Sequence, residues 1–201
     1  MKIICIGRNY VAHAAELNNE VPDQPVVFMK PATALLINEK PLYYPEFTQD
    51  LHYEIEMVVK ISKNGRYVQP EFASEYYDEV SLGIDFTARD LQSRCKDKSH
   101  PWEIAKAFDN SAALGEWQPI AKDIQDLRFS LKKNGETVQE GYTANMIFPV
   151  DDIIVYVSQF FKLQMGDIIY TGTPEGVGPV QIDDVLEGFL EGKKVLHTEI
   201  K

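Results

Sequence analysis

The first candidates for chemistry in this sequence are two glutamates, Glu54 and Glu56, which are separated by a single residue. They lie in the segment 51–61, where apolar and polar residues alternate as in a strand with one buried face. Two residues of a strand span about 7 Å, so both carboxylates can converge on one ion. Carboxylates at that distance repel each other, and a hard divalent cation relieves the repulsion. A solvated polar face is the alternative, and this segment alone favours it. The apolar face comprises Leu51, Tyr53, Ile55, Met57, Val59 and Ile61, and the polar face comprises His52, Glu54 and Glu56.

A second group of polar residues lies where a strand is expected to lead into a helix. The segment 80–85 indicates a buried strand that ends at Asp85. Arg89 and Gln92 follow at a spacing of three, which places them on one face of the helix. A carboxylate, a guanidinium and an amide gathered at a strand end can hold a metal and a substrate carboxylate together. A surface helix with an Arg–Asp pair is an equally good interpretation of this stretch alone.

His13 and Glu16 form a third polar pair, spaced three residues apart on an Ala-rich stretch. This spacing places them on one helical face. On the pattern alone, a solvated ion pair is the favoured interpretation. The alternative is a dyad in which the glutamate orients the imidazole as a general base.

The elements that must position these residues are mostly strands. Strands are expected over 2–6, 26–29, 51–61, 80–85, 127–133, 137–140 and 167–171, and helices over 9–18, 74–80, 150–162 and from about residue 88. Thr87 is expected as the N-cap of the last of these helices, with Asp90 completing a capping box. Asn134-Gly135 is a strong signal for a two-residue hairpin, and Glu191-Gly192 for a second turn. This mixture predicts a β-rich α+β fold rather than a doubly wound sheet.

Length and charge restrict the classes of function that are open. The chain has 201 residues, which suits one domain over residues 1–201. Its net charge of -11 argues against nucleic acid and anionic membrane surfaces as partners. No apolar run approaches the roughly 20 residues of a membrane span. Cys5 and Cys95 lack metal-ligand spacing, and the segment 1–7 predicts a strand rather than a signal peptide. A cytoplasmic protein with reduced thiols is therefore expected.

Taken together, these segments resemble the fumarylacetoacetate hydrolase family, in particular its short branch of acylpyruvases and oxaloacetate decarboxylases. The matching stretches occur in family order over nearly the whole chain. They are Gly7-Arg8-Asn9-Tyr10 with His13 and Glu16, Phe28-Met29-Lys30-Pro31, His52-Tyr53-Glu54-Ile55-Glu56, residues 85–92, Lys106-Ala107-Phe108-Asp109, Asn134-Gly135-Glu136, Met146-Ile147-Phe148 and residues 166–178. As a set, the Glu-x-Glu strand, the Asp-x-x-x-Arg-x-x-Gln helix and the Thr-Gly-Thr-Pro loop are specific.

The resemblance implies a rolled mixed β-sheet with short flanking helices, in a homodimer. It also implies that Mg²⁺ or Mn²⁺ is bound by the three carboxylates Glu54, Glu56 and Asp85. Such a set suits a hard cation and leaves coordination positions for a 2-oxo acid.

The remaining roles are also implied by the resemblance. Arg89 and Gln92 would orient the substrate, and Thr173 would bind its carboxylate. Lys106 would place a positive charge near the oxygen of a developing enolate. His13 and Glu16 would activate a water from a mobile lid within residues 1–25, with a hinge at 18–22. Lys30, next to Pro31, is expected on the substrate side as a support for that lid.

This constellation suits C–C bond cleavage next to a carbonyl that serves as an electron sink. It could hydrolyse acylpyruvates to pyruvate and a carboxylic acid, with oxaloacetate decarboxylation as a further activity. Tautomerisation or isomerisation of oxaloacetate or of a 2-hydroxy-diene-dioate needs only the cation and a base. A non-catalytic protein that binds a metal and a 2-oxo acid is the alternative from another class.

Overall fold

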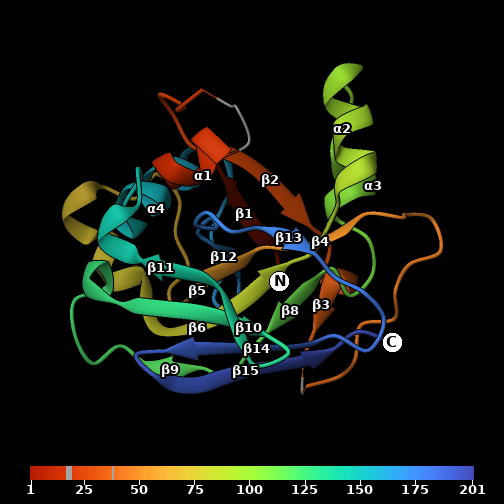
Figure 1. The fold of residues 1–201 in the computed structure, drawn as a ribbon. Helices are drawn as coiled ribbons and strands as arrows, with labels where there is room; N and C mark the ends of the chain where they lie inside the picture. The colour runs from red at the N-terminus through yellow and green to blue at the C-terminus, as the bar shows by residue number, and fades with distance from the viewer. Residues whose placement is uncertain (17–19, 38) are drawn as a thin grey trace.

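The computed structural model describes residues 1–16, 20–37 and 39–201 (Figure 1). A mixed sheet forms its centre and combines parallel β1–β12 and β3–β8 pairs with antiparallel ones. In order across the sheet, its strands are β2 (Val26–Lys30), β1 (Ile3–Gly7), β12 (Ile168–Tyr170), β5 (Ile55–Ile61), β6 (Tyr77–Asp85), β8 (Ala112–Leu114) and β3 (Leu35–Leu36), with β9 (Gln118–Pro119) also paired to β6. The predicted β-rich α+β fold is confirmed.

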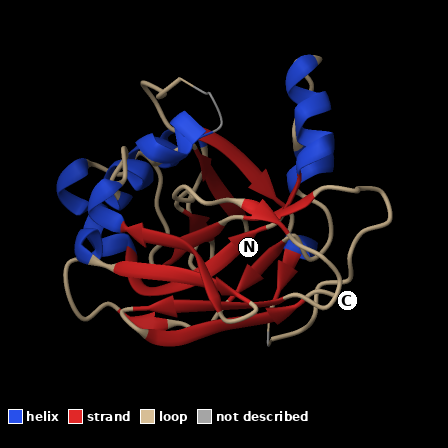
Figure 2. Ribbon diagram, in the orientation of Figure 1, coloured by secondary structure: helices blue, strands red, loops and turns tan. Residues whose placement is uncertain are grey.

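Two smaller sheets complete the curled half-barrel, and the helices lie around its outside (Figure 2). The four-stranded sheet has the order β11 (Glu136–Tyr142), β10 (Arg128–Lys133), β14 (Val185–Leu190), β15 (Lys193–Glu199). The three-stranded sheet has the order β13 (Gly178–Pro179), β4 (Leu51–Tyr53), β7 (Thr87–Ala88). The α-helices are α1 (Val11–Glu16), α2 (Arg89–Asp97), α3 (Glu103–Lys106) and α4 (Val150–Phe160), and the 3-10 helices are Ala32–Ala34, Pro70–Tyr76, Ile124–Asp126 and Thr143–Asn145. None of the helices in the described part of the chain has the length and apolar character needed to cross a membrane.

Strand β5 is buried on both faces, which explains why the solvated-face interpretation of segment 51–61 is wrong. The predicted apolar face packs in the larger core cluster, where Leu82 and Leu131 are among its neighbours. The opposite face also lies inside the molecule, because Val58 belongs to a second cluster with Ile3 and Tyr170. The carboxylates of Glu54 and Glu56 therefore lie in the interior of the molecule.

Both predicted tight turns are confirmed. Asn134 and Gly135 join β10 to β11 with φ angles of 53° and 86°. Glu191 and Gly192 join β14 to β15 with φ angles of 49° and 79°. Two successive positive φ angles are typical of the type I′ turn, whose twist matches that of the flanking strands.

Three predictions of local structure need correction. The strand predicted over 51–61 is interrupted at Glu54, and its two parts belong to different sheets. The predicted helix 74–80 is wrong beyond Tyr76, because residues 77–80 pair with β5 as the start of β6. Thr87 does not cap α2; it lies in β7 opposite His52, and Ala88 precedes the helix without a side-chain cap. The helix predicted over 9–18 is described as α1, and residues 17 and 18 lie outside the described residues.

Candidate active site

The carboxylates of Glu54, Glu56 and Asp85 meet where β4, β5 and β6 come together. Strand pairing sets Glu56 opposite Gly83, and the backbone nitrogen of Asp85 donates to the carbonyl of Glu54 at 2.9 Å. One oxygen from each carboxylate lies within 4.8 Å of the other two. The three residues are only 5%, 2% and 1% exposed. We call these three residues the acid triad.

Three buried or nearly buried cations surround the acid triad. Lys106 Nζ lies 2.7 Å from Glu54 Oε2 and 2.7 Å from Asp85 Oδ2. Arg89 Nη2 lies 2.5 Å from the other oxygen of Glu54. Lys30 Nζ lies 2.7 Å from Asp85 Oδ1. Two of the three carboxylates are thus held by direct ion pairs, which offset the cost of burying them.

The pKa values of the two glutamates move in opposite directions. Burial alone would raise the pKa of Glu54, but the charges of Lys106, Arg89 and His13 outweigh it and lower that pKa. Burial, reinforced by the charges of Asp85 and Glu54, raises the pKa of Glu56 well above its usual range. Glu56 has no cation as a partner within the described residues, and its Oε2 accepts a hydrogen bond from Gly172 N at 2.7 Å.

The acid triad fits a hard divalent cation. It offers three buried carboxylates that can face one point, which is the donor set that Mg²⁺ and Mn²⁺ prefer. Within the described residues Glu56 forms no ion pair, and a divalent cation would compensate its negative charge. The residues present therefore match the cation that the family resemblance implies.

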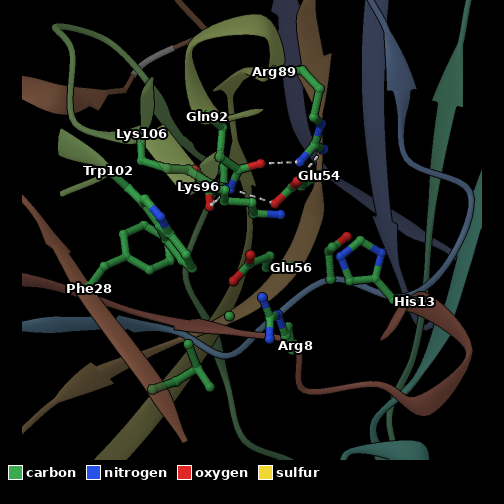
Figure 3. A pocket seen from close by; sticks show the side chains of 14 residues that line it. Arg8, His13, Phe28, Glu54, Glu56, Arg89, Gln92, Lys96, Trp102 and Lys106 are labelled. Carbon is green, nitrogen blue, oxygen red and sulfur yellow. Dashed lines mark hydrogen bonds and ion pairs between the residues drawn. The ribbon is translucent and has the colours of Figure 1, made fainter. Parts of the chain in front are cut away.

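A cavity with about 40 Å³ of space for the centres of water molecules opens onto the acid triad (Figure 3). Arg89 and Gln92 line it together, and Arg89 Nη1 donates to Gln92 Oε1 at 2.7 Å. The complete lining is Ile6, Gly7, Arg8, His13, Phe28, Glu54, Glu56, Asp85, Arg89, Gln92, Lys96, Trp102, Lys106 and Thr173. Sequence-predicted residues from five separate segments thus meet around one small space.

His13 and Glu16 approach this cavity from α1. His13 Nδ1 lies 3.2 Å from Glu16 Oε2, and the other oxygen of Glu16 accepts from Gly176 N at 3.1 Å. His13 is buried, so the solvated ion pair favoured by the pattern alone is not what the structure contains. A carboxylate beside Nδ1 favours the tautomer that carries the ring proton on Nδ1, in which Nε2 can accept a proton.

Lys30 lies elsewhere than expected. Its ammonium is buried behind Asp85, where it also donates to the carbonyl of Lys106 and to the hydroxyl of Ser111. It does not line the cavity, and among the described residues it forms no hydrogen bond or ion pair with α1. Its position supports the acid triad and not a lid, because its charge is committed to Asp85.

Gln139 is a positioning residue that the sequence analysis missed. Its Nε2 donates to Thr173 Oγ1 at 3.0 Å and to the carbonyl of Pro174 at 3.0 Å. Its Oε1 accepts from Ile55 N at 2.9 Å. One buried amide thus fixes the loop of Thr173 against the start of β5. No signal marks this residue in the sequence, because its partners come from segments far from its hairpin.

Arg8, Lys96 and Trp102 also line the cavity and received no role from the sequence. Arg8 belongs to the Gly-Arg-Asn-Tyr stretch, whose match to the family was a usable signal. Lys96 lies seven residues after Arg89, on the same face of α2, so helical spacing could have identified it.

Comparisons with known proteins agree with this geometry. The sequence pattern of the family described as fumarylacetoacetate (FAA) hydrolase C-terminal matches residues 2–200. The mitochondrial oxaloacetate tautomerase FAHD1 of Bos taurus is 43% identical over 201 residues, covering 99% of this chain and 90% of the relative. The oxaloacetate tautomerase YcgM of Escherichia coli (strain K12) is 41% identical over 194 residues, covering 95% and 89%.

Two solved structures show the same fold. A fumarylacetoacetate hydrolase family protein from Yersinia pestis CO92 has a TM-score of 0.95 and 39% identity, covering 100% of this chain and 93% of that one. A fumarylpyruvate hydrolase from Pseudomonas aeruginosa, in complex with Mn²⁺ and pyruvate, has a TM-score of 0.92 and 37% identity, covering 100% and 89%. The chain therefore belongs to the fumarylacetoacetate hydrolase family.

Proposed function

We propose that this protein is a divalent-cation-dependent enzyme that interconverts the keto and enol forms of oxaloacetate. The main observation in support of this proposal is a cavity of about 40 Å³ that is lined by the acid triad and by His13, a histidine with a free ring nitrogen. The relatives named oxaloacetate tautomerase, which are 43% and 41% identical, support this substrate.

Glu54, Glu56 and Asp85 would hold Mg²⁺ or Mn²⁺. The cation, when bound, supplies positive charge that polarises the 2-oxo group of the substrate. The related hydrolase that holds Mn²⁺ and pyruvate supports both the kind of ion and the kind of ligand. The three carboxylates do not distinguish Mg²⁺ from Mn²⁺, because both ions favour carboxylate oxygens.

The side chains around the cavity would orient the substrate. Arg89 and Gln92, joined by a hydrogen bond, present donors on one side, and Thr173 presents a hydroxyl from the opposite loop. These groups suit the carboxylate and the keto oxygen of a 2-oxo acid. Gln139 fixes Thr173 against Ile55, and Glu54 holds Arg89, so the donors are arranged before the substrate arrives.

His13 and Lys106 would move the proton. Figure 3 shows them on opposite sides of Glu56. His13 Nε2 takes a proton from C3 of oxaloacetate, the C–H electrons form the C2=C3 bond, and the carbonyl π pair moves onto the oxygen. The Lys106 ammonium donates to that oxygen as its charge grows and gives it the proton that completes the enol. Glu16 stabilises the protonated imidazole until its proton returns to solvent, and Lys106 regains a proton from solvent.

Hydrolysis of acylpyruvates is the second candidate. It is favoured by the His13–Glu16 pair, because a base held by a carboxylate is also the arrangement that activates water. In that reaction His13 takes a proton from water, and the oxygen attacks the distal carbonyl. The C–C bond then breaks, its electron pair forms the enolate of pyruvate, and the proton held by His13 converts this enolate to pyruvate as the acyl group leaves as a carboxylic acid. Decarboxylation of oxaloacetate would use the same electron sink without the base.

The test follows three reactions with one preparation. The enol absorbance of oxaloacetate reports tautomerisation, pyruvate release reports decarboxylation, and loss of the diketo absorbance of acetylpyruvate reports hydrolysis. Each is measured with Mg²⁺, after a chelator is added, and after Mg²⁺ is restored. We expect tautomerisation of oxaloacetate to be the fastest of the three reactions. Its turnover should stop when the chelator is added and return when Mg²⁺ is restored.

Glu54→Gln supplies the matched variant, and Glu79→Gln is its control. Glu79 pairs with Lys60 on the neighbouring strand, away from the acid triad. Glu54→Gln should abolish Mn²⁺ binding, followed by electron paramagnetic resonance, together with turnover, while Glu79→Gln should retain both. Oxaloacetate binding without turnover in any assay would contradict an enzyme and leave a non-catalytic binding protein.

A further inference from the structure

Two cations face the cavity without a counter-charge. Arg8 and Lys96 both line it, and Figure 3 shows both side chains pointing into it. Within the part of the chain that the structure describes, neither side chain has an ion pair or a hydrogen bond. The other cations at the site, Lys30, Arg89 and Lys106, are all held by the acid triad. Arg8 and Lys96 therefore carry positive charges that no ion pair among the described residues balances.

The backbone directs both side chains into this space. Arg8 follows β1 with a φ of 60°, a left-handed conformation that non-glycine residues seldom adopt outside functional or turn positions. Lys96 extends the line of Arg89 and Gln92 along one face of α2. Its ammonium lies 6.0 Å from the ring centre of Trp102, which packs edge-on against Phe28. Aromatic packing therefore positions a lysine that no carboxylate holds.

The charges around Lys96 also favour a bound anion. Burial, followed by the charges of Arg8 and Arg89, lowers the pKa of Lys96. Like charges that share a partly buried space repel, and an anion between them would relieve the repulsion. Among the described residues the acid triad forms no ion pair with Arg8 or Lys96, since Glu54 and Asp85 are paired with other cations and Glu56 accepts from Gly172.

We propose that Arg8 and Lys96 bind the second carboxylate of the substrate, which makes the enzyme selective for 2-oxo dicarboxylic acids over monocarboxylic ones. This inference rests on the proposed function, in which the cation, Arg89, Gln92 and Thr173 hold the 2-oxo acid end. A short diacid held at that end directs its distal carboxylate away from the acid triad, toward the remaining positive charge of the cavity.

The experiment compares oxaloacetate with its 4-methyl ester, which keeps the 2-oxo acid end and lacks the second charge. Lys96→Met should raise the KM for oxaloacetate about tenfold or more, the effect of one charge-assisted contact, with a smaller change in kcat. The KM for the ester should stay within about twofold of the wild-type value. Lys96→Arg should restore most of the affinity for oxaloacetate, and Arg8→Met should reproduce the selective loss.

Lys98→Met is the matched control, because Lys98 is an exposed cation two residues further along that does not line the cavity. It should leave both substrates unaffected, which excludes a general effect of net charge. An equal loss for oxaloacetate and the ester in Lys96→Met, or no loss in both Lys96→Met and Arg8→Met, would overturn the proposal.

Calorimetric binding separates this inference from the proposed function. If the wild-type protein turns over neither substrate, the proposed function fails. Binding of oxaloacetate and of the ester to the Mg²⁺-loaded protein still tests whether Arg8 and Lys96 bind the second carboxylate. Tighter binding of oxaloacetate that Lys96→Met abolishes supports the subsite, and equal binding of both compounds contradicts it.

Discussion

Glu16 Oε1 lies 3.1 Å from the backbone nitrogen of Gly176, so helix α1 is tied to the loop that carries Thr173. The other oxygen of the same carboxylate lies 3.2 Å from Nδ1 of His13. One side chain therefore links the placement of α1 over the cavity to the tautomer of the proposed base. Contact between α1 and that loop would therefore hold His13 in the orientation that the proposed base needs.

Glu16→Gln should lower kcat for oxaloacetate tautomerisation by about tenfold to a hundredfold, with a small change in KM. The amide can still accept from Gly176, but it cannot stabilise a charged imidazole. Stopped-flow measurement of the enol absorbance tests this, with Mn²⁺ binding as a check that the acid triad is intact. The exposed Glu20, changed to Gln, is the control. A kcat equal to that of the wild type would remove Glu16 from the mechanism.

Lys106→Met should destabilise the cation-free protein by about 3–5 kcal/mol, because it leaves buried carboxylates without their partner. Among the described residues, Lys106 alone forms ion pairs with both Glu54 and Asp85. Mg²⁺ should then stabilise the variant more than the wild type, since no ammonium competes for these oxygens. Thermal unfolding with chelator and with Mg²⁺ measures both effects.

Lys60→Met provides the comparison for that measurement, because Lys60 is a partly exposed lysine paired with Glu79. Its loss should cost about 1 kcal/mol or less, whether or not Mg²⁺ is present. Equal stabilisation of Lys106→Met and wild type by Mg²⁺ would show that Lys106 and the cation do not compete for the acid triad.

Gln139→Leu should lower the free energy of unfolding by about 2–4 kcal/mol, because Ile55 N and two loop carbonyls lose their buried partner. It should also raise the KM for oxaloacetate, since Thr173 loses the bond that fixes its hydroxyl. Urea unfolding and steady-state kinetics test the two effects. Glu140→Ala, at the exposed neighbouring position of β11, should change neither. Lost stability with an unchanged KM would confine Gln139 to a structural role.

Much of the site could be predicted from the sequence because its residues lie in short local patterns. The alternation in 51–61 correctly indicated which side chains pack in the core, and the spacing of Arg89 and Gln92 correctly placed them together. The polarity of the other face was misjudged, because the residues that pack beside Val58 there, such as Ile3 and Tyr170, come from separate strands that no local pattern brings together. The capping role of Thr87 failed for a similar reason: its hydroxyl accepts from Lys106, which comes from a distant segment.

Several expectations stay predictions. The lid within residues 1–25 is one, and part of its hinge at 18–22 lies outside the described residues. The homodimer and the extent of a single domain over 1–201 are others, as is the assignment of the individual site residues to their roles. The cytoplasmic location also stays a prediction, since the similar protein of Bos taurus is named mitochondrial.

A last prediction concerns the link between α2 and the loop before β4. Asp90 Oδ1 accepts from Thr48 Oγ1 at 2.6 Å and from its neighbour Leu91 N at 2.8 Å. Burial acts to raise the pKa of Asp90, but the bonds from Thr48, Leu91 and Gln49 outweigh it and lower that pKa. The folded protein thus binds fewer protons at Asp90 than the unfolded chain does in the acid range, so stability there rises with pH.

The stability that Asp90 contributes should therefore be complete above its ordinary pKa of about 3.9 and disappear as the pH falls through its lowered pKa. Asp90→Asn can keep the bond from Thr48 but loses this pH dependence. Urea unfolding of wild type and Asp90→Asn should differ most at about pH 7 and converge at about pH 3 or below. Asp97→Asn, an exposed change at the end of the same helix, is the control. A wild-type advantage that persists unchanged into acid would mean that the charge of Asp90 contributes nothing, and that the link to Thr48 acts through geometry alone.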